Sequence, residues 1–139
     1  MIRVSIYGVL GRLGSAIAKR LLGAEGFDLA GAVTRSSSPR LGEDLGEVLG
    51  LDHKGIPIRD RLPDSPGVIL DASSAGNLDA SLAAAIASQT PLVVVTTGHP
   101  DAAREKMREA GSAIPILFAP NLSLGVALLK HLIQRAAQV

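Results

Sequence analysis

Short apolar runs alternate with longer amphipathic runs along this chain, and the alternation is its dominant pattern. A short, almost wholly apolar run is typical of a strand that is covered on both faces of a sheet. Apolar residues that recur every three or four positions indicate a helix that buries one face. Strand and helix in regular succession form βαβ units, so the pattern predicts a parallel sheet with helices packed against it.

The boundaries of these runs predict six strands and five helices. The strands are expected at Ile2–Tyr7, Phe27–Val33, Ile56–Arg59, Val68–Ala72, Leu92–Thr96 and Ile116–Ala119. The helices are expected at Gly11–Leu22, Leu78–Ser88, Pro100–Gly111 and Leu124–Ala137, with a short one within Gly42–Leu49. Asn77 and Ser123 suit helix N-caps, Pro100 suits a first helical turn and Gly111 suits a helix end.

Right-handed crossovers between these strands favour one topology. It is a Rossmann-type, doubly wound α/β fold, with a mostly parallel sheet of about six strands in the order 3-2-1-4-5-6 and helices on both faces. Ligands bind such sheets at the carboxyl ends of the strands. The loops expected there are Gly8–Gly14, Thr34–Ser38, Ser73–Asn77, Thr96–Pro100 and Pro120–Ser123. Asp71, at a strand end, is expected to brace loops by hydrogen bonding rather than to act as a base.

Composition narrows the class of protein. A chain of 139 residues suits a single domain with one core, which must consist of aliphatic side chains because aromatic residues make up 2% of the sequence. The net charge of +1, without a dense basic block, argues against a nucleic-acid partner. The chain has no cysteine, which excludes disulfides and thiolate chemistry and is in keeping with the cytoplasm. The longest apolar runs are too short to span a bilayer, so a soluble protein is expected.

Three glycines follow the first predicted strand directly and open the first predicted helix. Gly8, Gly11 and Gly14 permit a tight turn in which the backbone approaches a ligand closely, and the helix start presents N–H donors with a partial positive charge. This arrangement predicts a dinucleotide pyrophosphate site. The first gap is one residue longer than in G-x-G-x-x-G, and a plain strand-to-helix turn or a mononucleotide site remains the alternative.

The loop after the second strand reads Thr34, Arg35, Ser36, Ser37. An Asp or Glu at this point binds the 2′-hydroxyl of NAD and would repel a 2′-phosphate, and Thr34 removes that repulsion. Arg35 supplies a planar cation and Ser36 a hydroxyl donor, so the loop predicts NADP(H) as the preferred cofactor, with NAD(H) also accepted. The alternative is that Arg35 is a solvated loop charge. Arg12 is placed either to reach the same phosphate or to cover the adenine side.

No metal site and no catalytic residue are predicted. His53, His99 and His131 share no metal-ligand spacing, and His99 is the best placed of the three because it lies in a ligand loop. On the last helix, Lys130 and Arg135 suit a solvated face. The apolar residues of that helix, expected to be mainly core but in part uncovered, are Val126, Leu128, Leu129, Leu132 and Ile133.

Four segments in order resemble one enzyme family. Residues 8–14, 68–73 (V-I-L-D-A-S), 94–98 (V-V-T-T-G) and 118–126 (F-A-P-N-L-S-L-G-V) are similar to the successive signatures of 4-hydroxy-tetrahydrodipicolinate reductase, also called dihydrodipicolinate reductase. The matches cover nearly the whole chain, and the last is the most specific. The resemblance implies reduction with NADH or NADPH to tetrahydrodipicolinate, on the lysine and diaminopimelate pathway.

The resemblance also implies roles for individual residues. The residues expected to bind the pyrophosphate and adenosine end are Gly8, Gly11, Arg12, Leu13, Gly14, Thr34, Arg35 and Ser36. Ser73 is expected near the nicotinamide ribose, and the residues expected to border the nicotinamide and substrate are Thr96, Thr97, Gly98, Ala119 and Asn121. Three positions depart from the family pattern, namely Thr34 for an acidic residue, Ala72 for phenylalanine and Val95 for glycine.

In the family, the last matched helix leads into a second domain that binds the dicarboxylate and supplies the proton, through a His-His-x-x-Lys stretch and a Gly-Thr pair. The sequence shows neither, so residues 1–139 are expected to be a dinucleotide-binding domain without the substrate domain, incomplete for catalysis by itself. Two alternatives stay open, a non-catalytic or regulatory dinucleotide-binding module and the cofactor subunit of another Rossmann reductase. Apolar surface on the last helix could drive a homo-oligomer.

Overall fold

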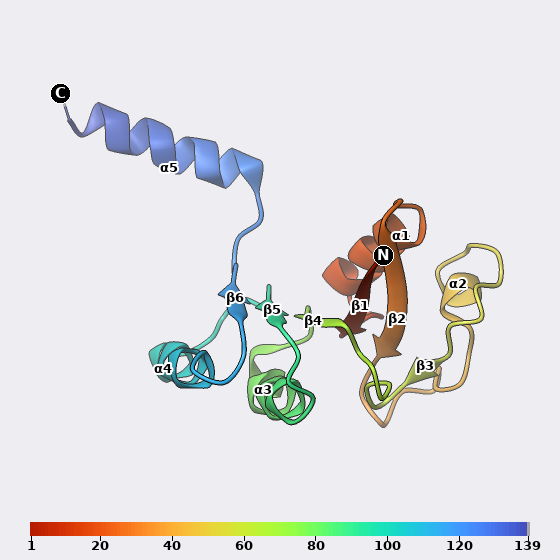
Figure 1. The fold of residues 1–139 in the computed structure, drawn as a ribbon. Helices are drawn as coiled ribbons and strands as arrows, with labels where there is room; N and C mark the ends of the chain where they lie inside the picture. Colours follow the sequence, from red (N-terminus) through yellow and green to blue (C-terminus); the bar gives the residue numbers. More distant parts are fainter. Residues whose placement is uncertain (139) are drawn as a thin grey trace.

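The computed structural model describes residues 1–138, so Val139 lies outside it, and its centre is a six-stranded sheet. The strands are β1 (Ile2–Tyr7), β2 (Phe27–Val33), β3 (Ile58–Arg59), β4 (Val68–Asp71), β5 (Leu92–Val94) and β6 (Ile116–Phe118). Every neighbouring pair is parallel, in the order β3-β2-β1-β4-β5-β6 (Figure 1). The predicted doubly wound topology is therefore confirmed.

Helices connect the strands as the periodicity predicts. They are α1 (Arg12–Leu22), α2 (Leu45–Val48), α3 (Leu78–Ala87), α4 (Asp101–Ala110) and α5 (Leu124–Ala136), with a 3₁₀ turn at Ala75–Asn77 before α3. The Ser123 side chain accepts a hydrogen bond from Val126 N–H and caps α5 as expected. Pro100 lies one position earlier than predicted, as the N-cap of α4, and Gly111 is its C-cap. None of the described helices combines the length and the apolar content needed to cross a membrane.

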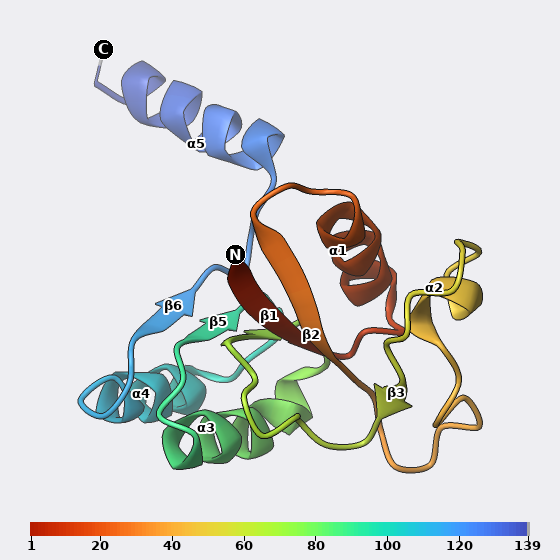
Figure 2. The same cartoon turned by 45° about the vertical axis from the view of Figure 1, so that its right-hand side comes forward.

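Two apolar clusters lie on opposite faces of the sheet. Helix α1 covers one face, and α3 and α4 cover the other (Figure 2). Buried members of the first cluster include Ile6, Ala18, Leu29, Leu45 and Ile58. Buried members of the second include Ile69, Leu82, Ala85, Val94 and Met107. Because side chains alternate between the faces of a strand, each central strand contributes to both layers, and this double cover explains its nearly continuous apolar sequence.

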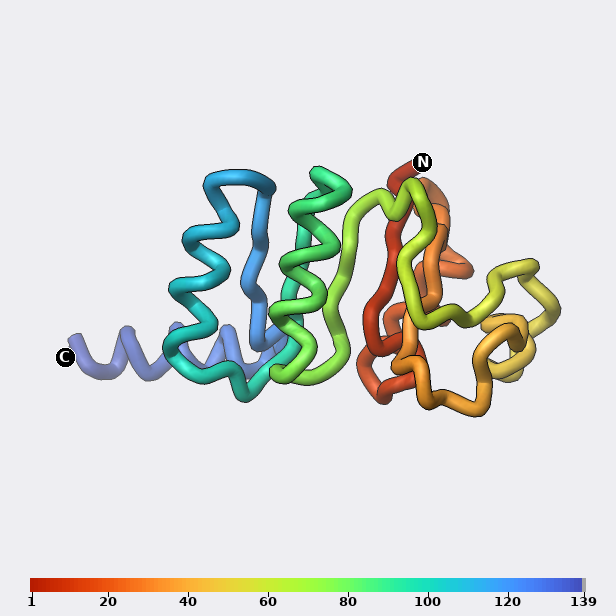
Figure 3. Tube along the Cα trace, turned by 90° about the horizontal axis from the view of Figure 1, so that it is seen from below, coloured from red at the N-terminus to blue at the C-terminus, as the bar shows by residue number. Residues whose placement is uncertain are grey.

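Helix α5 projects away from the sheet and its covering helices (Figures 1 and 3). No described residue of α5 is buried, and Leu128, Leu129, Leu132 and Ile133 are each between 55% and 58% exposed. The expectation that the apolar residues of this helix are mainly core is therefore wrong. The periodicity correctly indicates an apolar face, but periodicity does not say what covers that face.

Candidate functional site

The glycine turn brings three chain segments into close contact. Gly8 has φ +75°, a conformation that L side chains rarely adopt, and a Cβ at this position would lie 2.6 Å from the Cα of Ser73. Gly14 is buried, and a Cβ there would overlap the carbonyl oxygen of Gly8. These two glycines therefore let the first turn of α1 and the loop after β4 pack directly on the end of β1.

The hydrogen bonds of the turn determine which amides are free for a ligand. The N–H groups of Gly8 and Val9 donate to the carbonyl of Val33 at 2.9 and 3.2 Å, and Gly11 N–H donates to Gly8 O at 2.9 Å. The first N–H groups of a helix have no intrahelical acceptor, and at α1 they belong to Arg12 and Leu13. With the positive end of the helix dipole behind them, these amides form an anion-binding position.

A cavity of about 690 Å³ lies beside this turn. Six of the predicted site residues line it, namely Gly8, Gly11, Thr34, Arg35, Ser36 and Ser73. They come from the loops after β1, β2 and β4, which meet because the carboxyl ends of parallel strands lie at one edge of the sheet. Its volume falls within the range of small-molecule and cofactor sites.

The lining also includes four residues of the predicted ligand loops, namely Leu10, Ser38, Ser74 and Asn77. Three further lining residues, Tyr7, Asp60 and Ala80, lie outside the predicted loops. Asp60 directly follows β3, and Thr34 N–H donates to Arg59 O at 2.8 Å, which holds the two loops side by side. The third strand was predicted, so the residue after it was a detectable candidate. Asn77 was expected to be a helix N-cap, but its side chain makes no capping hydrogen bond, and its buried Nδ2 has no partner among the described residues.

The other predicted residues lie outside the lining of this cavity. Thr96, Thr97 and Gly98 follow β5, at the same edge of the sheet, and Gly98 has φ +78°. Ala119 and Asn121 follow β6, and Asn121 Oδ1 accepts a hydrogen bond from Ser123 N–H at 2.9 Å at the start of α5. Their contact with a nicotinamide stays a prediction.

Asp71 connects the loops around the cavity, as expected. Its side chain is fully buried, and Oδ1 accepts hydrogen bonds from Ser73 N–H at 3.0 Å and from Ser73 Oγ at 2.5 Å. Oδ2 accepts from Ser81 Oγ on α3 at 2.7 Å, and Thr96 Oγ1 donates to the Asp71 backbone oxygen at 3.1 Å. Burial, and secondarily the negative charge of Asp71, raise the pKa of the neighbouring Tyr7 above 10.0, so Tyr7 remains a neutral phenol.

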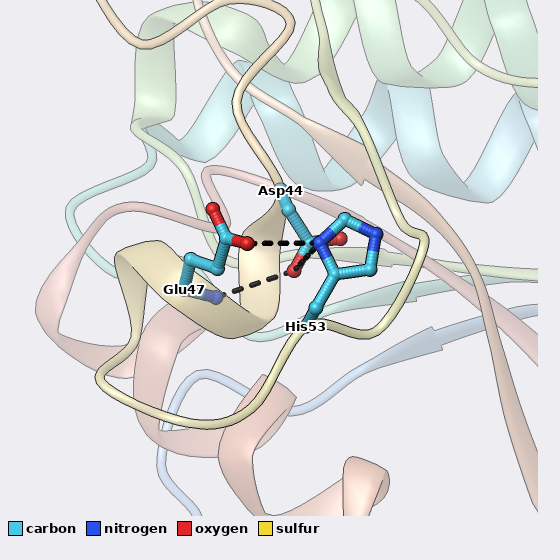
Figure 4. Close-up of side chains that lie close together, drawn as sticks. All are labelled: Asp44, Glu47 and His53. Atoms are coloured by element: carbon cyan, nitrogen blue, oxygen red, sulfur yellow. Dashed lines mark hydrogen bonds and ion pairs between the residues drawn. The ribbon is translucent and has the colours of Figure 1, made fainter.

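A second polar cluster closes the loop around α2 (Figure 4). Asp44 accepts hydrogen bonds from the N–H groups of Glu47 at 3.2 Å, Lys54 at 3.0 Å and Ile56 at 2.8 Å. His53 Nδ1 lies 2.9 Å from Glu47 Oε1 and 3.9 Å from Asp44 Oδ1. Asp44 and Glu47 were not among the predicted residues. Since three backbone donors already occupy the Asp44 carboxylate, the cluster serves as a clasp for residues 44–56.

The charges in this clasp shift two pKa values. Burial acts to raise the pKa of Asp44, but the three backbone hydrogen bonds and His53 outweigh it and lower that pKa to about 2. The hydrogen bond that the His53 ring donates to Glu47, followed by the charge of Asp44, raises the pKa of His53 above 6.5. His99, the best-placed histidine of the sequence analysis, instead packs edge-on against Phe118, with ring centroids 5.8 Å apart.

Comparison with known proteins shows which family this chain is similar to. A family model described as "Dihydrodipicolinate reductase, N-terminus" matches residues 2–122. The 4-hydroxy-tetrahydrodipicolinate reductase of Rubrobacter xylanophilus is 33% identical over 138 residues, with 99% of this chain and 52% of the relative aligned. The enzyme of the same name from Anaeromyxobacter dehalogenans is 32% identical over 142 residues, with 100% of this chain and 53% of the relative aligned. The chain thus spans about half the length of these relatives.

One solved structure shares the fold. It is a dipicolinate-bound dihydrodipicolinate reductase from Paenisporosarcina sp. TG-14, with a TM-score of 0.68 and 21% sequence identity. The similarity covers 92% of this chain and 50% of that one. At this identity the likeness shows the fold, namely a Rossmann-like sheet of parallel strands with helices.

Proposed function

Because this chain belongs to the N-terminal domain family of dihydrodipicolinate reductase, we propose that residues 1–139 form one dinucleotide-binding domain that takes NAD(P)(H) and prefers NADP(H). The observation that carries the proposal is the meeting of the glycine turn, the Arg35 loop and the Ser73 loop around one cavity of about 690 Å³. Each loop offers the chemistry that one part of such a cofactor needs.

The pyrophosphate is proposed to lie against the start of α1. There the N–H groups of Arg12 and Leu13 are free of intrahelical acceptors, and Gly11 lines the cavity with no Cβ to fill it. Gly8 contributes by conformation rather than by donating a hydrogen bond, since its N–H is already bonded to Val33 O, and Gly14 lets α1 pack against the carbonyl of Gly8.

The adenosine ribose is proposed to lie between the loops after β2 and β3. Arg35 and Ser36 line this part of the cavity and can donate hydrogen bonds to a 2′-phosphate, and Thr34 stands where an NAD-specific site has a carboxylate. Asp60 lines the same cavity and adds one negative charge. Arg35 therefore favours the 2′-phosphate of NADP(H), and the negative charge of Asp60 reduces that preference.

The nicotinamide end is proposed to lie toward Ser73, with Thr96, Thr97, Gly98, Ala119 and Asn121 beyond it at the same sheet edge. When bound, the cofactor would supply the hydride for reduction to tetrahydrodipicolinate in lysine and diaminopimelate biosynthesis. The chain spans about half the length of these relatives. Reduction is therefore proposed for these residues together with a site that binds the dicarboxylate substrate. We place the protein in the cytoplasm, with neither a nucleic acid nor a membrane as partner.

A fluorescence titration of the 139-residue chain with NADPH and with NADH tests this proposal. We expect saturable binding of both cofactors, with NADPH the tighter ligand. The carboxylates of the dipicolinate precursor need cations, and the cationic side chain in the cavity lining, Arg35, is proposed to pair with the cofactor. We therefore expect no NADPH oxidation when the precursor is added. Absence of binding would overturn the cofactor proposal, and steady oxidation dependent on the precursor would overturn the expectation of incompleteness.

A further inference from the structure

Three side chains that can bind a metal converge beside α2 (Figure 4). His53 Nδ1 lies 2.9 Å from Glu47 Oε1 and 3.9 Å from Asp44 Oδ1, and the three ligand atoms all lie within 4.8 Å of one another. In a tetrahedral zinc site with bonds of about 2.0–2.2 Å, neighbouring ligand atoms are roughly 3.4 Å apart. The two measured distances lie on either side of this value, so small side-chain movements bring all three atoms onto one ion.

Asp44 gives the cluster a fixed and buried member. Its side chain is 6% exposed, and its two oxygens accept hydrogen bonds from the N–H groups of Glu47, Lys54 and Ile56. A carboxylate has about four lone-pair positions, so three N–H donors hold the group in place and leave one position for a further partner. Hydrogen bonds of this kind orient the ligands of metal sites. The bonds that close the loop therefore also orient Asp44 as a ligand.

Closure of the loop does not account for the other two side chains. Glu47 and His53 are 62% and 69% exposed, and an ion pair between side chains this exposed contributes little to stability. Both nevertheless point toward the buried carboxylate of Asp44 (Figure 4). The three residues line one cavity of about 470 Å³, through which an ion can enter and in which it can keep a water ligand.

We propose that Asp44, Glu47 and His53 bind one divalent transition-metal ion of the zinc type. One imidazole nitrogen and two carboxylate oxygens suit Zn²⁺, whereas Mg²⁺ and Ca²⁺ prefer ligands that are all oxygen. The ion takes the place of the proton that the His53 ring donates to Glu47. This site shares no lining residue with the cavity beside the glycine turn, so the proposal does not depend on cofactor binding.

Calorimetric titration with ZnCl₂ tests the proposal on the 139-residue chain, treated with a chelator and free of an affinity tag. We expect one Zn²⁺ per chain, and no binding of MgCl₂ or CaCl₂ at the same concentrations. Glu47→Gln and His53→Gln should each lower the Zn²⁺ affinity at least about tenfold, because each removes a ligand. Glu109→Gln and His131→Gln, at exposed positions on α4 and α5, are the matched controls and should leave the affinity unchanged.

Imidazole nitrogen signals identify the ligand directly. In proton–nitrogen NMR spectra of the three histidines, Zn²⁺ should shift Nδ1 of His53 and leave the signals of His99 and His131 in place. A role of His53 in loop closure alone would not produce this shift. Because Glu47 and His53 are exposed, both variants are expected to fold, and thermal melts in the presence of chelator check this before the titration.

The proposal is overturned if the unmodified chain binds no Zn²⁺. Equal Zn²⁺ affinity in E47Q, H53Q and the unmodified chain would also overturn it, because the ion would then lie elsewhere. Binding of Mg²⁺ or Ca²⁺ as tight as that of Zn²⁺ would contradict the nitrogen ligand, and so would a His53 signal that Zn²⁺ does not shift.

Discussion

At the scale of single residues, the site depends on positions where an added side-chain atom would change its shape and on positions whose charge determines which ligand it binds. Gly8 and Gly14 are such positions, because a Cβ at either would meet backbone atoms of a neighbouring segment. Backbone is less able to move aside than the end of a flexible side chain. The shape of the turn is therefore fixed by sterics, and Arg35 and Asp60 then adjust its charge.

Gly14→Ala tests the steric part. Alanine normally stabilises a helix by about 0.5–1 kcal/mol relative to glycine. At Gly14 the new methyl would overlap Gly8 O, so we expect a destabilisation of about 1–3 kcal/mol by urea unfolding. Gly23→Ala, at the other end of α1 with no atom within 4 Å of its Cβ, is the matched control and should be neutral or stabilising. Equal effects of the two substitutions would contradict the close contact.

Arg35→Ala tests the charge. Loss of a hydrogen-bonding cation from a phosphate removes about 1.5–3 kcal/mol, so NADPH affinity should fall roughly ten- to a hundredfold. NADH, which lacks the 2′-phosphate, should change little, and Asp60→Asn should shift the preference further toward NADPH. Arg20→Ala, an exposed arginine in the last turn of α1, is the control in the same titration. An equal loss of affinity for NADPH and NADH in R35A would show that Arg35 does not bind the 2′-phosphate.

How far single residues can be predicted depends on whether their signal is local. Gly8, Thr34 and Arg35 follow predicted strands in the sequence, and the structure places all three in the cavity lining. Asn77 satisfied a local rule for helix caps, yet its side chain makes no capping bond. Asp60 follows the third predicted strand, which the predicted order places beside the second, so its position in the lining could also have been inferred.

At the scale of elements, periodicity predicts the bounds of a helix whether or not a sheet covers it. Helices α1, α3, α4 and α5 all lie within one residue of their predicted ends, and the first three pack on the sheet while no described residue of α5 is buried. The segment around α2 differs, since its order comes from the Asp44 clasp. One carboxylate there closes a loop in which Ile56 lies twelve positions further along the chain.

The clasp makes stability depend on pH in two ranges. The pKa of Asp44 is lower in the folded chain, so its contribution is complete above 3.8 and is lost as the pH falls toward about 2. The pKa of His53 is raised, so its contribution is complete below 6.5 and is lost as the pH rises through the raised value.

Thermal melts at about pH 5.5 and about pH 8.5 measure the histidine part. We expect the melting temperature to fall slightly between these values and the decrease to shrink in His53→Gln. His131→Gln, on the exposed helix α5, is the control.

Asp44→Ala should lower the melting temperature by several degrees at neutral pH, because three N–H groups lose their acceptor. An unchanged melting temperature in D44A would show that Asp44 does not stabilise the loop of residues 44–56.

At the scale of the whole molecule, the fold separates a covered sheet from an uncovered helix. The topology, the parallel pairing and both apolar layers could be predicted from the sequence because each follows from contacts within the described chain. The environment of α5 could not, since an amphipathic pattern is the same whether its apolar face meets a core or solvent. Leu124 is 84% exposed at the start of this helix.

The exposed face of α5 is expected to drive self-association. Leu128 and Leu132 lie one turn apart on this helix, 57% and 55% exposed, and apolar surface of this kind is stabilised by burial. Light scattering after size exclusion should show a dimer whose fraction rises with concentration. Leu128→Glu with Leu132→Glu should give a monomer, and Gln134→Glu with Gln138→Glu adds the same charge as a control. A monomer at all concentrations would contradict this expectation.

A crystal structure of this chain saturated with NADPH tests the proposed cofactor site. We expect the pyrophosphate at the start of α1, with oxygens about 2.7–3.2 Å from the N–H groups of Arg12 and Leu13. The 2′-phosphate should lie beside Arg35, and the second ribose should lie near Ser73. A cofactor bound away from the glycine turn, or a turn left empty at saturation, would contradict the account.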